Sequence, residues 1–303
     1  MPALLIITDG LIPSDAAPDS GLCLHPALSL WQGQLQSRSR RWFACADRTP
    51  LDWYAAAAGT SPAGLLANRI GALPEHTCQC WVASPFHTQL GRDRVHVLAE
   101  AEFPWCEEDA EWLCALLNPL LQQQGMHLLA VGAAMLLACE QALDAHPASF
   151  AAIAGHLLPD RHPEGVDDGR LARLLAEIQM LLFQHPAAHR RARGEVDVNG
   201  IWFWGATEMP DTTRPRHIAT TTSNPVLRSL TREHDARLMI SEAGRLPALL
   251  GEDRSLPPAI LLAGHGHAVL LTKSIWPKFG KHTWRPVSVE SETSLLVQLE
   301  DMA

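Results

Sequence analysis

Three arginines close together, Arg190, Arg191 and Arg193, form the one locally basic stretch of the sequence. A guanidinium stays charged at physiological pH and matches the geometry of phosphate and carboxylate groups. We therefore consider Arg190 and Arg193 as ligands of a small phosphorylated or carboxylate molecule. The alternative is a solvated helix end, where the negative end of the helix dipole favours basic side chains.

A run of bulky residues follows the arginines and supplies a second set of polar groups. Asn199 precedes the apolar run 201–204, and Glu208 comes shortly after it. A buried indole N–H usually finds a hydrogen-bond partner, so Trp202 and Trp204 either line a pocket or fill the core. We expect Asn199, Trp202, Trp204 and Glu208 to lie around a ligand pocket, with a plain hydrophobic core as the alternative.

Other candidate ligands are scattered along the chain. Asp9 follows the apolar run 4–7, and α/β folds place ligand chemistry at the carboxyl ends of strands, although Asp is also a common turn residue. Asp160 and His162 form a closely spaced pair, but the neighbouring prolines indicate an exposed loop. His265 and His267 lie on either side of one glycine and, with Asp9, are weak metal candidates; ordinary loop histidines are the alternative.

Cys78 and Cys80 alternate with polar or bulky neighbours, which is typical of a strand that points both thiols to one face. A zinc site needs about four ligands, and no second pair has matching spacing. We expect buried free thiols, with a metal pair as the alternative. Seven cysteines without framework spacing indicate reduced thiols and a cytoplasmic protein.

Composition excludes several functional classes. The 303 residues carry a net charge of −9, which argues against a nucleic-acid-binding protein. The longest apolar run, 128–139, is too short to cross a membrane, which takes about 20 residues. The N-terminus has neither a basic region nor a long apolar run, so we expect no signal peptide.

The spacing of apolar residues predicts the elements that position these groups. Leu171, Leu174, Ile178 and Leu182 fall on one face of a helix that Pro186 ends or bends, and a buried strand stopped by Gly205 follows it. Further helices are predicted at 26–42, 53–58, 62–71, 107–120 and 226–239, strands at 4–7 and 78–82, and hairpins at 86–98 and 260–271. Segment 126–139 fits a strand or a helix equally well, and so does 293–299.

Strands that alternate with helices predict an α/β protein, with a mixed sheet flanked by helices. We see no internal repeat and no clear linker, so we expect a single domain over 1–303. A smaller C-terminal subregion at 225–303 is the alternative.

Two sequence pieces resemble the bacterial regulatory proteins of the RpfE type. They are E-I-Q-M-L-L-F-Q-H-P (Glu177–Pro186) and R-G-E-V-D-V-N-G-I-W-F-W-G (Arg193–Gly205). That family is similar to cofactor-independent phosphoglycerate mutases of the archaeal kind, in the alkaline-phosphatase-like superfamily. Three weaker pieces agree with it: Leu158–Gly165, Ser84–Val97 and Leu4–Leu11.

The resemblance is strongest over 80–205 and has departures. Ala187 and Ala188 stand where the family usually has Val-Asn, Gly200 where a Ser is common, and Ala206 where a second glycine often follows. The resemblance implies a mutase-like α/β fold in a degenerate form.

The mutases imply a particular chemistry: a Ser or Thr nucleophile and two divalent metals held by Asp and His, which clamp an in-line displacement. Asp9 is one possible ligand, but no motif supports Thr60 or Ser61 as the nucleophile. The mutases' Asp-Glu-x-x-His segment is missing.

We therefore predict an RpfE-type regulatory protein that lacks catalysis, needs no metal cofactor and binds a small anion or a protein partner. A divergent phosphoglycerate mutase or phosphatase that uses Mn²⁺ or Zn²⁺ is the alternative. A third hypothesis is a scaffold that docks on another protein through a tryptophan-rich surface.

Overall fold

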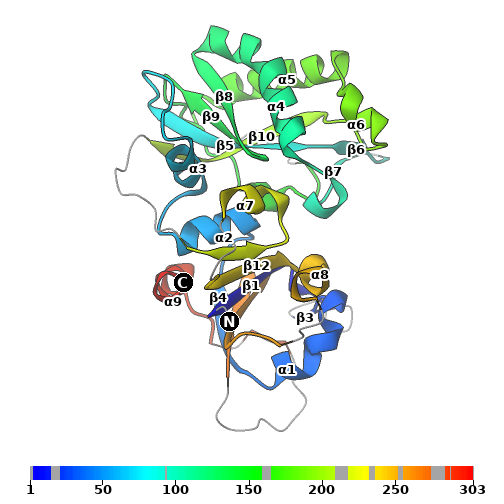
Figure 1. Ribbon diagram of the computed structural model, residues 1–303, viewed down its shortest axis with the longest axis vertical. Coiled ribbons are helices and arrows are strands. Elements are labelled where there is room, and N and C mark those ends of the chain that lie inside the picture. Colours follow the sequence, from blue (N-terminus) through cyan, green and yellow to red (C-terminus); the bar gives the residue numbers. More distant parts are fainter. Residues whose placement is uncertain are drawn as a thin grey trace. The chain divides into compact units, whose positions relative to one another are not determined.

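The computed structural model describes residues 3–14, 21–92, 94–158, 165–208, 218–231, 236–251, 255–273, 284–286 and 288–302. The chain folds as two compact units (Figure 1). Unit 1 contains Met1–Gly59 and Arg216–Ala303, and unit 2 contains Thr60–Pro215. The single domain that the sequence predicts stays a prediction. In the described part of the chain, no helix is both long enough and apolar enough to span a membrane.

Unit 1 is built on a mixed six-stranded sheet, which confirms the predicted α/β class. In sheet order its strands are β11 (Thr220–Thr222), β12 (Leu238–Glu242), β1 (Leu4–Thr8), β13 (Ala259–Gly264), β14 (His267–Thr272) and β4 (Ser39–Ala44). β1 runs parallel to β12 and β13, its neighbours on either side, and β11 is parallel to β12. All five residues of β1 are buried, because helices cover both faces of the sheet.

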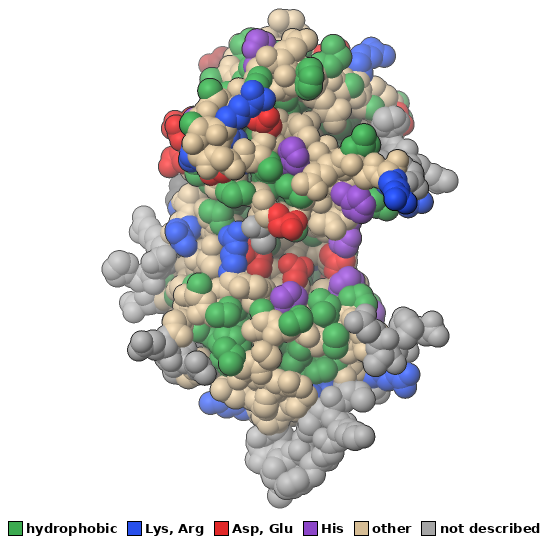
Figure 2. Space-filling view, turned by 90° about the vertical axis from the view of Figure 1, so that its right-hand side faces the viewer, with side chains coloured by type: hydrophobic (Ala, Val, Ile, Leu, Met, Phe, Trp, Pro, Cys, Tyr) green, Lys and Arg blue, Asp and Glu red, His purple; other side chains and the backbone are tan. Residues whose placement is uncertain are grey.

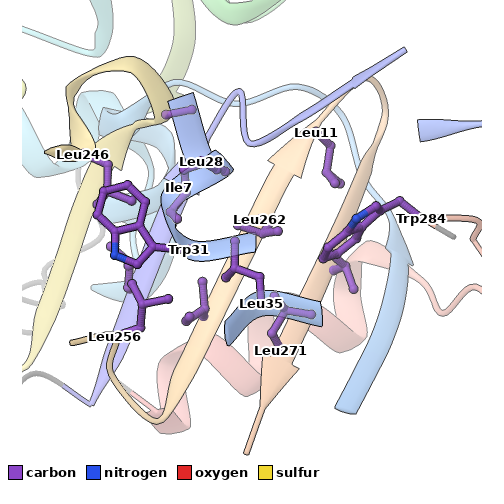
Figure 3. Close-up of a cluster of buried hydrophobic side chains, with 14 of the residues drawn as sticks. Ile7, Leu11, Leu28, Trp31, Leu35, Leu246, Leu256, Leu262, Leu271 and Trp284 are labelled. Carbon is purple, nitrogen blue, oxygen red and sulfur yellow. The ribbon is translucent and has the colours of Figure 1, made fainter. Parts of the chain in front are cut away.

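One face of this sheet packs on the segment after β3 (Leu22–Leu24) and on the segment after β12. The helices there are η1 (Pro26–Trp31), α1 (Gln32–Gln36), η5 (Ala243–Arg245) and α8 (Leu246–Leu250). Figure 3 shows Trp31 and Leu246 of this layer close to Ile7, and Leu35 close to Leu271 of the sheet. Tryptophan and leucine side chains thus form a continuous hydrophobic core on this face.

The other helices of unit 1 are α2 (Pro50–Ala57), α7 (Pro225–Leu230) and α9 (Glu292–Met302). They contact strands β12, β11 and β4, and α2 packs on both α7 and α9. Figure 1 shows α9 on the opposite side of the strands from α1 and α8. A short hairpin of β2 (Leu11–Pro13) and β3 (Leu22–Leu24) follows β1.

Unit 2 is built on an antiparallel four-stranded sheet. In sheet order its strands are β10 (Gly200–Glu208), β5 (Gln79–Phe86), β9 (Ala134–Cys139) and β8 (Met126–Val131). Its helices are α3 (Pro62–Ile70), α4 (Glu107–Leu121), α5 (Asp168–Gln184) and α6 (Ala188–Ala192), with short 3-10 turns η2 (Glu100–Glu102), η3 (Gln122–Gln124) and η4 (Phe150–Ala152). β6 (Thr88–Leu90) and β7 (Val95–Val97) form the predicted hairpin.

Most predicted elements are confirmed, and three need correction. The helix expected at 26–42 ends at Gln36, because residues 39–44 pair with β14. The helix expected at 226–239 ends at Leu230, and Leu238 already belongs to β12. The strand expected to stop at Gly205 continues to Glu208 through a register shift, with Gly205 in a positive-φ conformation.

The two ambiguous segments are resolved by their neighbours. Residues 126–139 form the hairpin of β8 and β9, and both strands take part in the sheet of unit 2. Residues 292–302 form helix α9, whose Leu295 and Leu299 are fully buried.

Candidate functional site

The ends of three parallel strands of unit 1 bring polar side chains together. We call the residues that end β11, β12 and β1 the carboxyl edge: Asn224, Glu242, Thr8 and Asp9. The register pairs Thr8 with Glu242 across β1 and β12, so the two side chains lie on the same face of the sheet. α/β folds commonly bind ligands at the carboxyl ends of such strands.

Glu242 is the buried carboxylate of the carboxyl edge. Its Oε1 accepts a hydrogen bond of 2.8 Å from Nδ2 of Asn224. Its Oε2 lies 3.0 Å from Nε of Arg245 as an ion pair, yet that contact lacks hydrogen-bond geometry, and Oε2 has no hydrogen-bond partner among the described residues. An amide and a guanidinium therefore hold the carboxylate in place.

The hydroxyl of Thr8 is buried beside Glu242 and has no hydrogen-bond partner in the described part of the chain. Asn224 also caps α7, because its Oδ1 accepts hydrogen bonds from the backbone N–H groups of Val226 and Leu227. Buried polar groups are nearly always hydrogen-bonded, so the Thr8 hydroxyl stands out at this edge.

Asp9 lies directly after β1, as the sequence predicts. Its carboxylate is exposed, and its backbone has a φ of 55°. This left-handed conformation is uncommon for residues other than glycine, although Asp adopts it more readily than most. The turn formed by Asp9 and Gly10 then continues to β2.

His265 and His267 lie in the turn of the β13–β14 hairpin, at the same end of the sheet as Asp9. His265 is exposed with a φ of 51°, and Nδ1 of His267 lies 3.0 Å from the backbone oxygen of His265. The backbone N–H of Gly266 donates to the carboxylate of Asp47 over 3.0 Å. These contacts describe a capped hairpin turn, and a metal role for the two histidines stays a prediction.

The predicted basic cluster lies in unit 2, and Arg190 is its buried member. Nη1 of Arg190 donates to Oδ2 of Asp109 and to the backbone oxygen of Pro104, each over 2.8 Å. Both Arg190 and Asp109 are fully buried. The guanidinium also lies over the ring of Phe103, 4.8 Å from its centroid, which offsets part of the cost of burial.

Asp109 is the centre of a network that we call the Asp109 network. Its carboxylate also receives hydrogen bonds from His189 at 2.8 Å, from Arg193 at 2.7 Å and from the thiol of Cys106 at 3.3 Å. Burial by itself raises the pKa of Asp109, but the hydrogen bonds from Cys106 and Arg193 and the charge of Arg190 outweigh it and hold the pKa below its usual value. The carboxylate is therefore charged at neutral pH.

The two exposed arginines are also paired with carboxylates. Arg191 forms an ion pair of 2.8 Å with Asp197, and Arg193 contacts Glu108 at 2.7 Å and Glu195 at 3.0 Å. The hydrogen bonds that Arg193 donates to Glu195 and Asp109 raise its pKa. All three arginines are thus matched by acidic neighbours, and anion binding by Arg190 and Arg193 stays a prediction.

Asn199, Trp202 and Trp204 are placed by β10. The side chain of Asn199 bonds both the backbone N–H and the backbone oxygen of Thr88, at 2.7 and 3.0 Å. Trp202 is buried and donates to the backbone oxygen of Ala148, and Trp204 is buried and donates to the hydroxyl of Ser84. The side-chain amide of Asn199 and both indole N–H groups thus have hydrogen-bond partners within unit 2, which fits a structural role.

The remaining candidates are not brought into one site. Glu208 is exposed at the end of β10, and Asp160 and His162 lie outside the described residues. Cys80 is buried in β5, and burial raises the pKa of its thiol to about 11. The residues that the structure describes contain no group of three or more His, Cys, Asp or Glu side chains arranged to hold a metal ion.

Sequence reasoning missed three residues that the structure brings together, namely Thr8, Asn224 and Glu242. Two of them carried a usable signal. Asn224 followed by Pro225 is a helix start, with the Asn as cap and the Pro in the first turn. Glu242 ends an apolar run, but the assignment of 226–239 to a helix hid that strand.

Comparisons with known proteins give structural neighbours only. No protein-family model and no curated protein matches the sequence. The PH0037 protein from Pyrococcus horikoshii is 12% identical with a TM-score of 0.45, and the match covers 99% of this chain and 97% of that chain. The cofactor-independent phosphoglycerate mutase from Thermoplasma acidophilum is 12% identical with a TM-score of 0.36, and the match covers 99% of both chains. A likeness of this degree is no evidence for a family, a site or an activity.

Proposed function

We propose that this chain is a non-catalytic binding protein of the RpfE regulatory type and that the carboxyl edge binds its ligand. The observation that carries the proposal is that two residues paired across β1 and β12 each bury a polar atom, the hydroxyl of Thr8 and Oε2 of Glu242. Neither has a hydrogen-bond partner among the described residues. Leaving a buried hydroxyl without a partner costs about 1–3 kcal/mol, so Thr8 suits a ligand that supplies one, and Oε2 of Glu242, whose contact is the ion pair with Arg245, can accept a hydrogen bond from the same ligand.

The hydrogen-bonding chemistry of the two atoms limits the class of ligand that they could bind. A carboxylate only accepts hydrogen bonds, whereas a threonine hydroxyl both donates and accepts. A ligand hydroxyl would donate to Glu242 and accept from Thr8. Arg245, whose side chain is 30% exposed, is the neighbouring cation that would contact an acidic group of the ligand. We therefore propose a small hydroxy acid, phosphorylated or carboxylate, as the ligand class.

Two further observations support binding without catalysis. The carboxylate of Glu242 contacts one amide and one guanidinium, and the described residues place no group of three or more His, Cys, Asp or Glu side chains there that could hold a metal ion. The family resemblance of Glu177–Pro186 and Arg193–Gly205 to RpfE-type proteins adds the regulatory role. The comparisons add nothing to this role.

The proposal is tested by calorimetric titration of the protein with 3-phosphoglycerate and, separately, with glycerate, in the presence of EDTA. We expect saturable binding of at least one of them. Thr8→Val keeps the shape of the side chain and removes the hydroxyl, so we expect binding to weaken by about fivefold or more. Thr221→Val, in strand β11 of the same sheet and half-buried, is the matched control and should bind like the wild type.

Absence of binding by the wild type to both probes would contradict the proposed ligand class. Unchanged affinity in a folded Thr8→Val variant would contradict the proposed site. Interconversion of 2- and 3-phosphoglycerate in added Mn²⁺ would instead support the divergent mutase.

A further inference from the structure

Helix α5 of unit 2 has two apolar faces, and only one of them is covered. Its inner face, with Leu171, Leu174, Ile178 and Leu182, is buried against β10. Its outer face carries Met180 and Phe183, whose exposed fractions are 62% and 88%. Large apolar side chains that are this exposed and lie one turn apart mark an interaction surface.

The outer face has a graded composition along the helix. We call the residues Gly169, Ala172, Ala176, Met180 and Phe183 the α5 stripe; they follow one another at spacings of three or four. The amino-terminal half of the stripe is small, and the carboxyl-terminal half is large. The space above the small half is open, because a Cβ at Gly169 would meet no atom within 4 Å.

This gradation is self-complementary. If two copies of α5 pack antiparallel about Ala176, Phe183 of one copy faces Gly169 of the other, and Met180 faces Ala172. Large side chains then fill the space above small ones, as close packing between helices requires. A parallel arrangement would place large against large and leave the small half unfilled.

The charges beside the stripe agree with the same arrangement. Arg173 and Glu177 lie one turn apart on the same flank of α5, and the structure shows no ion pair between either of them and another described residue. In an antiparallel pair, a two-fold axis brings the same flanks together. Arg173 of each copy then lies beside Glu177 of the other, which makes two equivalent ion pairs.

We propose that the α5 stripe is the interface of a homodimer in which two copies of this chain pair antiparallel through α5. The helix has 17 residues and is about 25 Å long, so the contact is at the small end of specific interfaces. We therefore expect a reversible dimer with a dissociation constant on the order of 10 μM. This inference is independent of the ligand proposed for unit 1.

Sedimentation velocity of the full chain, over concentrations from about 1 to 200 μM, measures the dissociation constant. Phe183→Glu places a charge at both ends of the contact, where Phe183 faces Gly169 of the other copy, and we expect it to weaken association by about tenfold or more. Leu90→Glu is the matched control, because Leu90 is 83% exposed in the same unit but lies outside the stripe. It should associate like the wild type.

Charge reversal identifies the partner and the orientation. Arg173→Glu and Glu177→Arg should each associate more weakly than the wild type, because each brings like charges together. An equimolar mixture of the two variants restores opposite charges across the interface and should regain association as a heterodimer.

A wild-type chain that remains monomeric throughout the concentration range would overturn the proposal. So would a Phe183→Glu variant that associates normally, or a mixture of the charge variants that associates no better than each alone.

Discussion

At the scale of single residues, the Asp109 network differs from the other ion pairs because its two central charges are buried. Asp109 and Arg190 are both fully buried, and the carboxylate receives donors from four side chains. Removing one partner of a buried ion pair leaves an uncompensated charge in the interior. The network therefore fixes the position of the start of α4 relative to α6.

Asp109→Asn should lower the free energy of unfolding by about 3–5 kcal/mol, because Arg190 would keep its buried charge without the carboxylate. Asp197→Asn is the matched control, since it breaks the exposed pair with Arg191 and should cost much less. Urea unfolding followed by tryptophan fluorescence measures both. Equal losses would contradict a special role for the buried pair.

The Asp109 network also predicts acid sensitivity. The pKa of Asp109 is lower in the folded protein than its ordinary value of 3.8, so the charged carboxylate stabilises the fold above that value. This contribution is lost as the pH falls below about 4 towards the folded-state pKa. The stability difference between wild type and Asp109→Asn should therefore shrink between pH 5 and pH 3, and a constant difference would contradict the assignment.

Asn199 provides a second test at this scale. Its side chain bonds both backbone groups of Thr88 and joins β10 to the start of β6. Asn199→Ala should cost about 1–3 kcal/mol, because these half-buried backbone groups lose their hydrogen bonds. Arg191→Ala removes an exposed ion pair and should cost less. Superimposable melting curves for the two variants would show that Asn199 is not structural.

At the scale of elements, the sequence predicts what depends on local periodicity. The spacing of Leu171, Leu174 and Ile178 is sufficient to predict α5, and the apolar run 201–204 is sufficient to predict β10. The prediction of one helix over 226–239 was wrong, because α7 and β12 follow each other closely and both are apolar. Only the pairing of Leu238 with Leu4 decides where the strand begins.

The candidate site depends on the order of the strands in the sheet, and the spacing of apolar residues in the sequence does not reveal that order. Asp9 was predicted because it directly follows a strand, whereas Thr8 and Glu242 became neighbours only when β1 and β12 paired. The arginines form a recognisable cluster in the sequence, but Asp109, which pairs with Arg190, and Glu108, which pairs with Arg193, are more than 80 residues away. Contacts between distant segments therefore decide what these side chains can do.

The contact between β10 and β5 gives a prediction at this scale. A Cβ at Gly200 would lie 2.3 Å from ring atoms of Phe86, so Gly200→Ala should destabilise the protein by about 1–3 kcal/mol. Gly33→Ala is the matched control, because no atom lies within 4 Å of its Cβ position in α1. Thermal unfolding of the two variants measures the difference, and a neutral Gly200→Ala would mean that the strands adjust freely.

At the scale of the whole molecule, the surface gives no reason to expect a polyanionic partner. The net charge is −9, and Figure 2 shows the Lys and Arg side chains of that face scattered rather than gathered. Among the described residues Trp112 is half-buried, so the tryptophan-rich docking surface of the third hypothesis stays a prediction, and the other described tryptophans are buried: Trp31, Trp42, Trp53, Trp81, Trp105, Trp202, Trp204 and Trp284. The exposed apolar side chains that remain belong to other residues, notably those of α5.

The central claim is that the chain binds a small ligand without catalysing a reaction on it. The most direct test combines two assays on one sample purified without chelator: metal content, and interconversion of 2- and 3-phosphoglycerate in added Mn²⁺. We expect no interconversion and no stoichiometric metal. About two metal ions per chain together with turnover would contradict it, because that is the stoichiometry of a two-metal phosphoryl-transfer site.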